Sequence, residues 1–354
     1  MLHRRELINL ATTAAAALPA LSDTVAAQDY PARPVTLIVP YSAGGSADTL
    51  PRVIAERMRT SLGKPVIIEN ATGAAGGIGA GRIARAPPDG YTFGLGTWST
   101  HVANGAVYSL QYDVQDDFEP IAQIAFSPLL IATAKHLPPN NLGELISWLK
   151  ANPDKTSQGT NGPGSVMHLA GVLLQEQTGT RYNFVPYRGS APAMNDLLGG
   201  QIDLYIGLPA DLLPHTRAGN VKIHAVASRQ RMTTAPDIPT ADEAGLPGFY
   251  VAAWFGFWAP RGTPKEVITR LNAATRGALA DPAVRRRLQE ELSLEIPRPD
   301  LPATLRAFQA AEIEKWWPDH PSGQDQGRMT WCRTHSNTSP RRVASKATCR
   351  SRRR

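Results

Sequence analysis

Two glycine-rich segments have the residue types and the position to bind an anion. Residues 40–49 follow the apolar run Val35–Val39, and residues 70–79 follow the run Val66–Glu69, so each joins a predicted strand to a predicted helix. The first amides of a helix have no partner within it and carry a partial positive charge, and glycine lets a ligand approach the backbone. Either segment alone is equally well explained as a tight turn. Together, at the carboxyl ends of adjacent strands, they predict an anion site built from backbone amides.

Enzymatic chemistry has weaker support in the sequence. Residues 79–84 match the pattern G-x-G-x-x-A of dinucleotide-binding folds, but they lie inside a predicted helix, and no acidic residue follows about 20 residues later. The sequence contains neither a P-loop nor a Gly-x-Ser-x-Gly nucleophile motif, and its histidines lack metal-ligand spacing. Ser165 and His168 could share a helix face, although helix capping by Ser165 is the commoner explanation. We therefore expect a binding protein rather than an enzyme, with no catalytic residue, metal or cofactor.

Charge is distributed unevenly along the chain. The 354 residues carry a formal net charge of +7, but residues 319–354 hold nine basic and two acidic residues, which leaves 28 of each in residues 1–318. A nucleic-acid surface needs clustered Lys and Arg, so this balance argues against nucleic acid as a partner of the body, residues 28–318. Both cysteines, Cys332 and Cys349, lie after the body, which therefore has no disulfide, Cys-ligated metal or cysteine nucleophile.

Residues 1–27 have the three parts of a secretory signal peptide. Arg4 and Arg5 form a positive end, an Ala-rich apolar stretch extends to Leu21, and Val25–Ala27 is a small-residue cleavage site. The alternative is an ordinary amphipathic N-terminal helix. Because the paired arginines also fit a twin-arginine signal, we expect export to the periplasm by the Sec or the twin-arginine route.

Strand and helix patterns alternate along the body. A helix is predicted over about Ala47–Leu62, and a third strand, Tyr91–Leu95, follows the second helix. Two starting points are possible for the first helix because of Pro51. If Ser46 is the cap, Pro51 removes one intrahelical hydrogen bond; if Asp48 is the cap, Pro51 fits the first turn. The order strand–helix–strand–helix–strand predicts an α/β fold with parallel sheets and right-handed crossovers. The further predicted elements are strands at 121–124, 129–134, up to 185, 202–206 and 221–227, an extended segment at 251–258, and helices from 142, after 165, over 191–198, from 264, from 282 and over 305–316.

A series of short motifs runs through the body in order. It opens with Tyr30–Val35 and Val39–Thr49. It continues with residues 70–79, 88–92, 99–101, 163–165 with His168, 185–193, 200–203 and 259–264. This series spans about residues 29–318 and resembles the substrate-binding receptors of tripartite tricarboxylate transporters, the Bug or TctC-like family.

The resemblance implies a two-domain clamshell of the periplasmic-binding-protein type, each domain a mainly parallel sheet flanked by helices. Domain one would comprise residues 28–127 plus 254–318, and domain two residues 128–253, joined by two extended crossovers. The implied function is that of a monomeric extracytoplasmic receptor, which binds a small organic carboxylate between the domains and delivers it to the large and small membrane subunits of such a transporter. The alternatives are a module that reports its ligand to a membrane sensor kinase, and an enzyme on the same fold.

The resemblance also implies which residues meet the ligand. Its carboxylate would meet the backbone N–H groups of the first loop, with the second loop and ordered waters completing the shell, and residues 161–165 and 187–191 would close over it. Arg188 is either a buried cation there or a surface residue beside a turn, and Trp98 either stacks on a flat ligand or belongs to the core. The expected ligand-binding residues are Tyr41, Ser42, Ala43, Gly44, Gly45, Ser46, Ala47, Asp48, Thr49, Thr72, Gly73, Ala74, Gly76, Gly77, Trp98, Ser99, His101, Asn161, Gly162, Gly164, Ser165, His168, Tyr187, Arg188, Gly189, Ser190 and Asp203.

The composition changes abruptly after Pro318. Residues 319–354 are rich in Arg, Ser, Thr, Cys and Pro, and we expect a disordered basic tail. We predict that this tail stems from a shifted or erroneous reading frame, because relatives continue with an apolar helical segment. The alternative is a genuine tail that binds nucleic acid or anionic surfaces. Reading the other frames of the gene beyond the Pro318 codon checks the prediction, which fails if none of them encodes an apolar ending.

Overall fold

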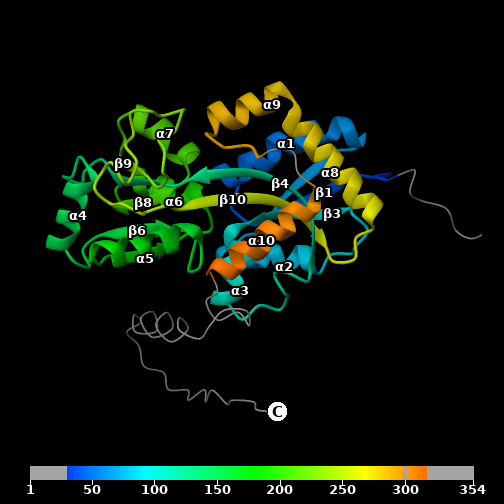
Figure 1. Cartoon of the computed structure of the whole chain (residues 1–354), viewed down its shortest axis with the longest axis horizontal. Coiled ribbons are helices and arrows are strands. Elements are labelled where there is room, and N and C mark those ends of the chain that lie inside the picture. The colour runs from blue at the N-terminus through cyan, green and yellow to red at the C-terminus, as the bar shows by residue number, and fades with distance from the viewer. Residues whose placement is uncertain (1–29, 298–300, 317–354) are drawn as a thin grey trace, which may run out of the picture.

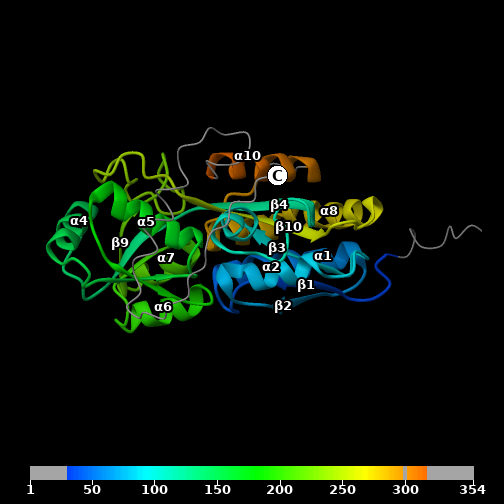
Figure 2. The same cartoon turned by 90° about the horizontal axis from the view of Figure 1, so that it is seen from below.

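Two domains, each built around one five-stranded sheet, make up the fold (Figures 1 and 2). The computed structural model describes residues 30–297 and 301–316. The predicted signal peptide and basic tail lie outside the described residues. Domain one contains the sheet formed by β1–β4 and β10, and domain two contains the sheet formed by β5–β9. The residue limits predicted for the two domains stay predictions.

The sheet of domain one has the strand order β2-β1-β3-β10-β4. Its strands are β1 (Val35–Val39), β2 (Val66–Asn70), β3 (Thr92–Thr97), β4 (Phe118–Pro128) and β10 (Ala252–Pro260). Strand β1 is parallel to both of its neighbours, whereas β10 is antiparallel to β3 and to β4. The apolar, β-branched residues of β1 suit its buried position inside the sheet.

The helices of domain one follow its strands and cover the sheet. They are α1 (Ser46–Leu62), α2 (Gly77–Ala84), α3 (Asn104–Val107), α8 (Lys265–Ala280), α9 (Pro282–Arg286) and α10 (Pro302–Trp316), with short helical turns at Ala74–Gly76, Ser99–Ala103 and Arg287–Glu291. Helix α1 packs against α8, and α10 packs against β4. The apolar face predicted for α1 is buried, as at Leu50, Ile54 and Met58.

The sheet of domain two repeats this arrangement, with the order β7-β6-β8-β5-β9. Strands β6, β7 and β8 are mutually parallel, and β5 is antiparallel to β8 and β9. Its strands are β5 (Leu130–Ala134), β6 (Ser157–Thr160), β7 (Asn183–Pro186), β8 (Leu204–Gly207) and β9 (Val221–Val226). Its helices are α4 (Leu142–Ala151), α5 (Val166–Thr178), α6 (Ser190–Leu198) and α7 (Pro209–Arg217). In each sheet one strand runs against the other four, so the predicted mainly parallel α/β architecture is confirmed.

Strands β4 and β10 connect the two domains. They pair along their length from Ala252↔Pro128 to Pro260↔Phe118, and in Figure 1 they run through the middle of the molecule between the two lobes. Beyond β4 the chain continues almost directly into β5, and the amide of Leu129 donates to the carbonyl of Val251 at 3.0 Å. Buried apolar residues continue from the first sheet across β4 and β10 to α4 and α5. Two paired strands and a continuous buried core therefore join the domains.

Among the described residues, no helix has both the length and the apolar composition needed to cross a membrane.

Helix α10 is fixed to domain one by a buried polar side chain. Gln309 is 1% exposed. Its Nε2 donates to the carbonyl of His101 at 2.9 Å and to that of Val114 at 2.7 Å. Helix α10 thereby holds two segments of domain one that are about 200 residues earlier in the chain.

Gln309→Leu should destabilise the protein by about 1–3 kcal/mol, because two buried carbonyl groups lose their donor. The measurement is the urea midpoint followed by tryptophan fluorescence. Glu314→Gln, an exposed change on the same helix, serves as the control and should leave the midpoint in place. An unchanged midpoint for Gln309→Leu would show that these bonds do not anchor α10.

Candidate functional site

A small cavity lies at the boundary between the domains. Its volume is about 20 Å³, room for about one water molecule. Residues of both domains and of the connecting strand β10 line it: Tyr41, Ala47, Thr97, Trp98, Ser99, Asn161, Val166, Met167, Leu208, Ala253 and Phe255. The loop after β1 and the loop after β6 therefore meet here, as expected for strand ends that face the same cleft.

Uncharged groups form the wall of this cavity. The hydroxyls of Tyr41 and Thr97 are 2.9 Å apart, and the amide of Val166 donates to Ser99 Oγ at 3.1 Å across the domain boundary. Asn161 Oδ1 is buried and has no hydrogen-bond partner among the described residues. Of the described residues that line the cavity, none is Lys, Arg, His, Asp or Glu. A negative charge placed here would have to be met by backbone amides, amide side chains and hydroxyls.

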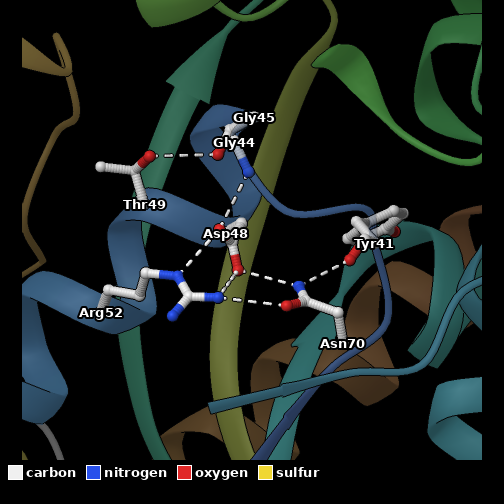
Figure 3. Close-up of polar contacts among 7 residues, drawn as sticks. All are labelled: Tyr41, Gly44, Gly45, Asp48, Thr49, Arg52 and Asn70. Atoms are coloured by element: carbon white, nitrogen blue, oxygen red, sulfur yellow. Dashed lines mark hydrogen bonds and ion pairs between the residues drawn. The ribbon is translucent and has the colours of Figure 1, made fainter. Parts of the chain in front are cut away.

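The first glycine-rich loop is held from within by Asp48 (Figure 3). Its Oδ2 accepts from the amide of Gly44 at 3.0 Å and from Arg52 Nε at 2.8 Å. Its Oδ1 accepts from Arg52 at 2.9 Å and from Asn70 at 2.8 Å, and Asn70 also donates to the carbonyl of Tyr41 at 2.8 Å. Burial alone would raise the pKa of Asp48, but the hydrogen bonds from Arg52, Asn70 and Gly44 outweigh it and lower that pKa. Asp48 therefore shapes the loop, and its expected contact with the ligand stays a prediction.

The amides of the first loop alternate between paired and unpaired. Ser42 donates to the carbonyl of Arg188 at 3.1 Å, and Ser46 donates to Asp211, both in domain two. The amides of Ala43, Gly45 and Ala47 have no acceptor in the described part of the chain. Ala47 also lines the cavity. The loop thus presents N–H groups at the start of α1, where the helix dipole favours an anion.

Helix α1 begins at Ser46 with Gly45 as its cap, so Pro51 lies inside the helix rather than in its first turn. Pro51 has no N–H to give to the carbonyl of Ala47, so one intrahelical bond is absent near the site. Thr49 Oγ1 turns back and donates to the carbonyl of Gly45 at 3.2 Å. Neither Ser46 nor Asp48 is the cap, so both expected caps are wrong, but the lost intrahelical bond expected with Ser46 as the cap also follows with Gly45.

The second glycine-rich loop has an unusual backbone. Ala74 and Ala75 have φ angles of 48° and 49°, in the left-handed region that non-glycine residues rarely adopt. Their carbonyls both accept from Asn104 Nδ2, at 3.4 Å. A Cβ on Gly162 of domain two would lie 3.7 Å from the amide nitrogen of Ala75, so this strained turn contacts the opposite domain.

The two loops of domain two lie against the first domain. Ser165 caps α5 by accepting from the amide of His168 at 3.2 Å, as the capping explanation predicts. The ring of His168 packs edge-on against Phe184 at 4.6 Å. The hydroxyl of Tyr187 donates to Asp196 at 2.6 Å, and Tyr187 does not line the cavity. The side chain of Arg188 is exposed, so the surface alternative describes it.

Glycine is required where these loops touch. Gly189 has a φ of 155°, and a Cβ there would collide with Ser42. A Cβ on Gly45 would lie 3.3 Å from Ser190 Cβ and 3.5 Å from the amide of Ala191. The close approach of the two domains at the first loop therefore depends on the absence of these side chains.

Most of the predicted ligand-binding residues come together at this boundary. Those that line the cavity are Tyr41, Ala47, Trp98, Ser99 and Asn161. Those in the surrounding loops are Ser42, Ala43, Gly44, Gly45, Ser46, Thr49, Thr72, Gly73, Ala74, Gly76, Gly77, Gly162, Gly164, Ser165, Gly189 and Ser190. Trp98 is 4% exposed, as its core alternative expects, and it also lines the cavity, so stacking on a flat ligand stays a prediction.

Two predicted residues lie elsewhere. The ring of His101 stacks on Trp258 at 4.5 Å within the core of domain one, and burial lowers its pKa to about 3, so it is a neutral core residue. Asp203 precedes β8 and accepts from the amide of Ser157, the first residue of β6, at 2.8 Å. It therefore lies at the opposite ends of these strands from the cavity.

Several residues at the boundary were not predicted. Apart from Thr97, the unpredicted lining residues are apolar, and nothing in their pattern separates them from core residues: Val166, Met167, Leu208, Ala253 and Phe255. Asp211 had a readable signal, because Pro209 followed by Asp211 is a typical helix start. Reading that helix would have placed an acid at a strand end facing the cleft.

The fold defines a class: a two-domain α/β protein of the periplasmic-binding-protein type, with a small cavity at the boundary between its domains. The sequence model of the tripartite tricarboxylate transporter family receptor matches residues 50–317, and the chain belongs to this family of periplasmic binding proteins. BugT of Bordetella pertussis is 38% identical over 308 residues, which are 86% of this chain and 92% of the relative.

Solved structures of the same family have the same fold. MatC from Rhodopseudomonas palustris with bound malate is 39% identical, with a TM-score of 0.78 over 81% of this chain and 98% of that one. The periplasmic binding protein BugD is 40% identical, with a TM-score of 0.78 over 81% and 96%. An R. palustris protein with adipate is 37% identical, with a TM-score of 0.78 over 82% and 96%. The predicted family and clamshell class are thereby confirmed.

Asp48→Asn should lower stability at neutral pH by about 1–3 kcal/mol, because Arg52 loses a charged acceptor. The folded-state pKa of Asp48 lies below its ordinary 3.8, so its contribution is complete above that value and is lost as the pH falls through the folded pKa. The variant should therefore lose less stability than the wild type on acidification. Melting temperatures between about pH 7 and about pH 3 measure this. Asp237→Asn, at an exposed site, is the matched control; parallel curves for Asp48→Asn and wild type would contradict the prediction.

Proposed function

We propose that this chain is a periplasmic receptor that captures a small organic carboxylate between its domains and delivers it to the membrane subunits of a tripartite transporter. The observation that carries the proposal is the first loop, whose Ala43, Gly45 and Ala47 amides have no acceptor among the described residues. Three such donors at the start of a 17-residue helix suit a carboxylate. The malate and adipate bound by related receptors support the same ligand class.

The mechanism is capture by hinge closure, with no bond made or broken in the ligand. The ligand carboxylate would enter the open cleft and bind the amides of the first loop on domain one. Domain two would then close through residues 161–165 and 187–191, with β4 and β10 bending between the domains. Closure removes water from the ligand and strengthens each hydrogen bond to it, because the dielectric constant around the site falls.

A thermal-shift screen tests the proposed ligand class. Purified full-length chain is heated with mono-, di- and tricarboxylates, malate and adipate among them, and with aromatic acids and amino acids. Each acid is paired with its neutral amide. A ligand at about 100 times its Kd stabilises the folded state by about 2.7 kcal/mol, so the cognate acid should raise the melting temperature and its amide should not. Failure of every acid, or equal shifts with the amides, would refute carboxylate capture.

Two follow-up measurements separate transport from the alternatives. Recovery of the ligand unchanged after prolonged incubation distinguishes a receptor from an enzyme. Uptake of the identified acid should require both this chain and the membrane subunits of the transporter. Uptake that persists without the chain would refute the delivery role while leaving ligand binding intact.

Gly45→Val should abolish binding of the identified acid while leaving the fold largely intact. Gly45 has an extended backbone, with φ −84° and ψ 168°, that valine adopts easily, but its side chain would meet Ser190 and block closure. Isothermal titration should show at least a hundredfold weaker binding, about 2.7 kcal/mol or more. Gly277→Val is the control, because a Cβ there would meet nothing nearer than Ser61 Oγ at 3.8 Å. Unchanged affinity for Gly45→Val would remove the first loop from the site.

A further inference from the structure

Trp98 lies where the wall of the cavity meets helix α10. It directly follows β3, is 4% exposed and lines the cavity. Its ring meets the ring of Trp316, the last residue of α10, edge-on, with 5.3 Å between the ring centroids and 82° between the ring planes. Trp316 does not itself line the cavity. The end of α10 therefore contacts the cavity wall from outside.

Helix α10 holds this part of the wall at two points. It lies beside β4 and packs against the short helical turn Ser99–Ala103, which follows Trp98 (Figure 2). Within that turn, the carbonyl of His101 accepts from Gln309 of α10 at 2.9 Å. Gln309 and Trp316 have the i, i+7 spacing of one helix face. One face of α10 therefore contacts both the turn and the ring that precedes it.

The ring of Trp316 has a second contact on its own helix. Lys315 Nζ lies 5.1 Å from the centroid of that ring, a distance at which an ammonium group is attracted to an aromatic face. The same ammonium group lies 3.9 Å from Glu312 Oε1. Although Trp316 is 41% exposed, contacts with Lys315 and Trp98 therefore limit the orientation of its ring.

The orientation of Trp98 matters because it is the largest side chain that lines the cavity. Edge-to-face aromatic pairs stabilise a structure beyond the effect of the area that they bury. A side chain that is fixed before binding loses no further rotamer freedom when a ligand binds, whereas a mobile one must be ordered at that moment. A fixed indole also gives the wall one shape, against which carbon skeletons of different length can be distinguished.

We propose that Trp316 is a positioning residue, which fixes the orientation of Trp98 and thereby the length of the carbon skeleton that the cleft accepts. This role rests on the proposed function, because it needs a carboxylate that binds in the same cleft. Trp316 acts through Trp98 and does not touch the ligand. Without the Trp316 ring, Trp98 is free to turn, so acids bind more weakly and differ less in affinity.

Two substitutions at Trp316 test this role in the full-length chain. Trp316→Ala removes the ring, whereas Trp316→Phe keeps an aromatic edge for Trp98. Glu314→Gln, an exposed change on the same helix, is the control. Crystal structures of the variants without added acid give the orientation of Trp98. Isothermal titration with linear mono- and dicarboxylates, up to the length of adipate, gives the affinities.

In Trp316→Ala, Trp98 should lose its single orientation. The acid of this series that the wild type binds most tightly should bind about three- to tenfold more weakly, and the affinity ratio between acids of different length should fall. Trp316→Phe should restore the orientation of Trp98, with affinities within about twofold of the wild type. Glu314→Gln should match the wild type in both measurements.

Two results would overturn the proposal. Trp98 in its original orientation in Trp316→Ala would show that Trp316 does not fix it. Equal loss of affinity for every acid would show that Trp316 only stabilises α10. If none of these acids binds to the wild type, the proposed ligand class is at fault, and the structures alone decide whether Trp316 fixes Trp98. If Trp316→Ala does not fold, Trp316→Leu, which also lacks a ring, takes its place.

Discussion

The central constraint in this structure is that the first amides of a helix need acceptors from outside the helix. At α1, Asp48 takes the Gly44 amide from within the loop, and Asp211 takes the Ser46 amide from the opposite domain. The amides of Gly45 and Ala47, two buried residues beside these, have no acceptor among the described residues. Because a buried donor without an acceptor costs free energy, the loop is poised to accept an anion. One local requirement of helix geometry thus links the loop, domain closure and the expected ligand.

Domain closure imposes a second constraint, because the loops must approach without side chains in the way. Gly45 and Gly189 are found where the loops after β1 and β7 touch. The paired strands β4 and β10 would limit the direction of the proposed movement, since their ladder is continuous from one domain toward the other. In the proposed closure such a connection would bring the same small set of backbone groups together each time, so the geometry of the proposed site would depend on the backbone more than on charged side chains.

Sequence patterns predicted the helices and strands that have strong apolar periodicity. They failed for elements whose secondary structure depends on burial by the rest of the fold. The apolar run Val35–Val39 is a central strand, as expected, whereas the strand Ser157–Thr160 has no β-branched alternation and forms because it is buried between β7 and β8. The positions of the glycine-rich loops were predicted correctly, because the sequence alone shows where an apolar strand ends and an amphipathic helix begins. His101 and Asp203 do not lie at the cavity. Tertiary packing, which the sequence pattern does not show, decides which end or face of an element points to the cleft. The helix start at Pro209 could have placed Asp211 at a strand end, but its contact with Ser46 joins helix starts 165 residues apart and depends on the tertiary fold.

The absence of charged side chains from the described cavity lining has a consequence for selectivity. Amides and a helix dipole bind any carboxylate to a similar degree, because they act on the group that all such ligands share. Asp211 contacts Ser46, which lies between Gly45 and Ala47 in the chain. A ligand carboxylate bound to the amides of Gly45 or Ala47 would therefore lie close to the carboxyl group of Asp211. That group would repel a second negative charge of the ligand on the same side. Discrimination among ligands therefore falls to the apolar wall, which includes Met167 and Phe255. If the proposed carboxylate binds at the first loop, the length and shape of its carbon skeleton, rather than its number of charges, would decide whether this cleft accepts it.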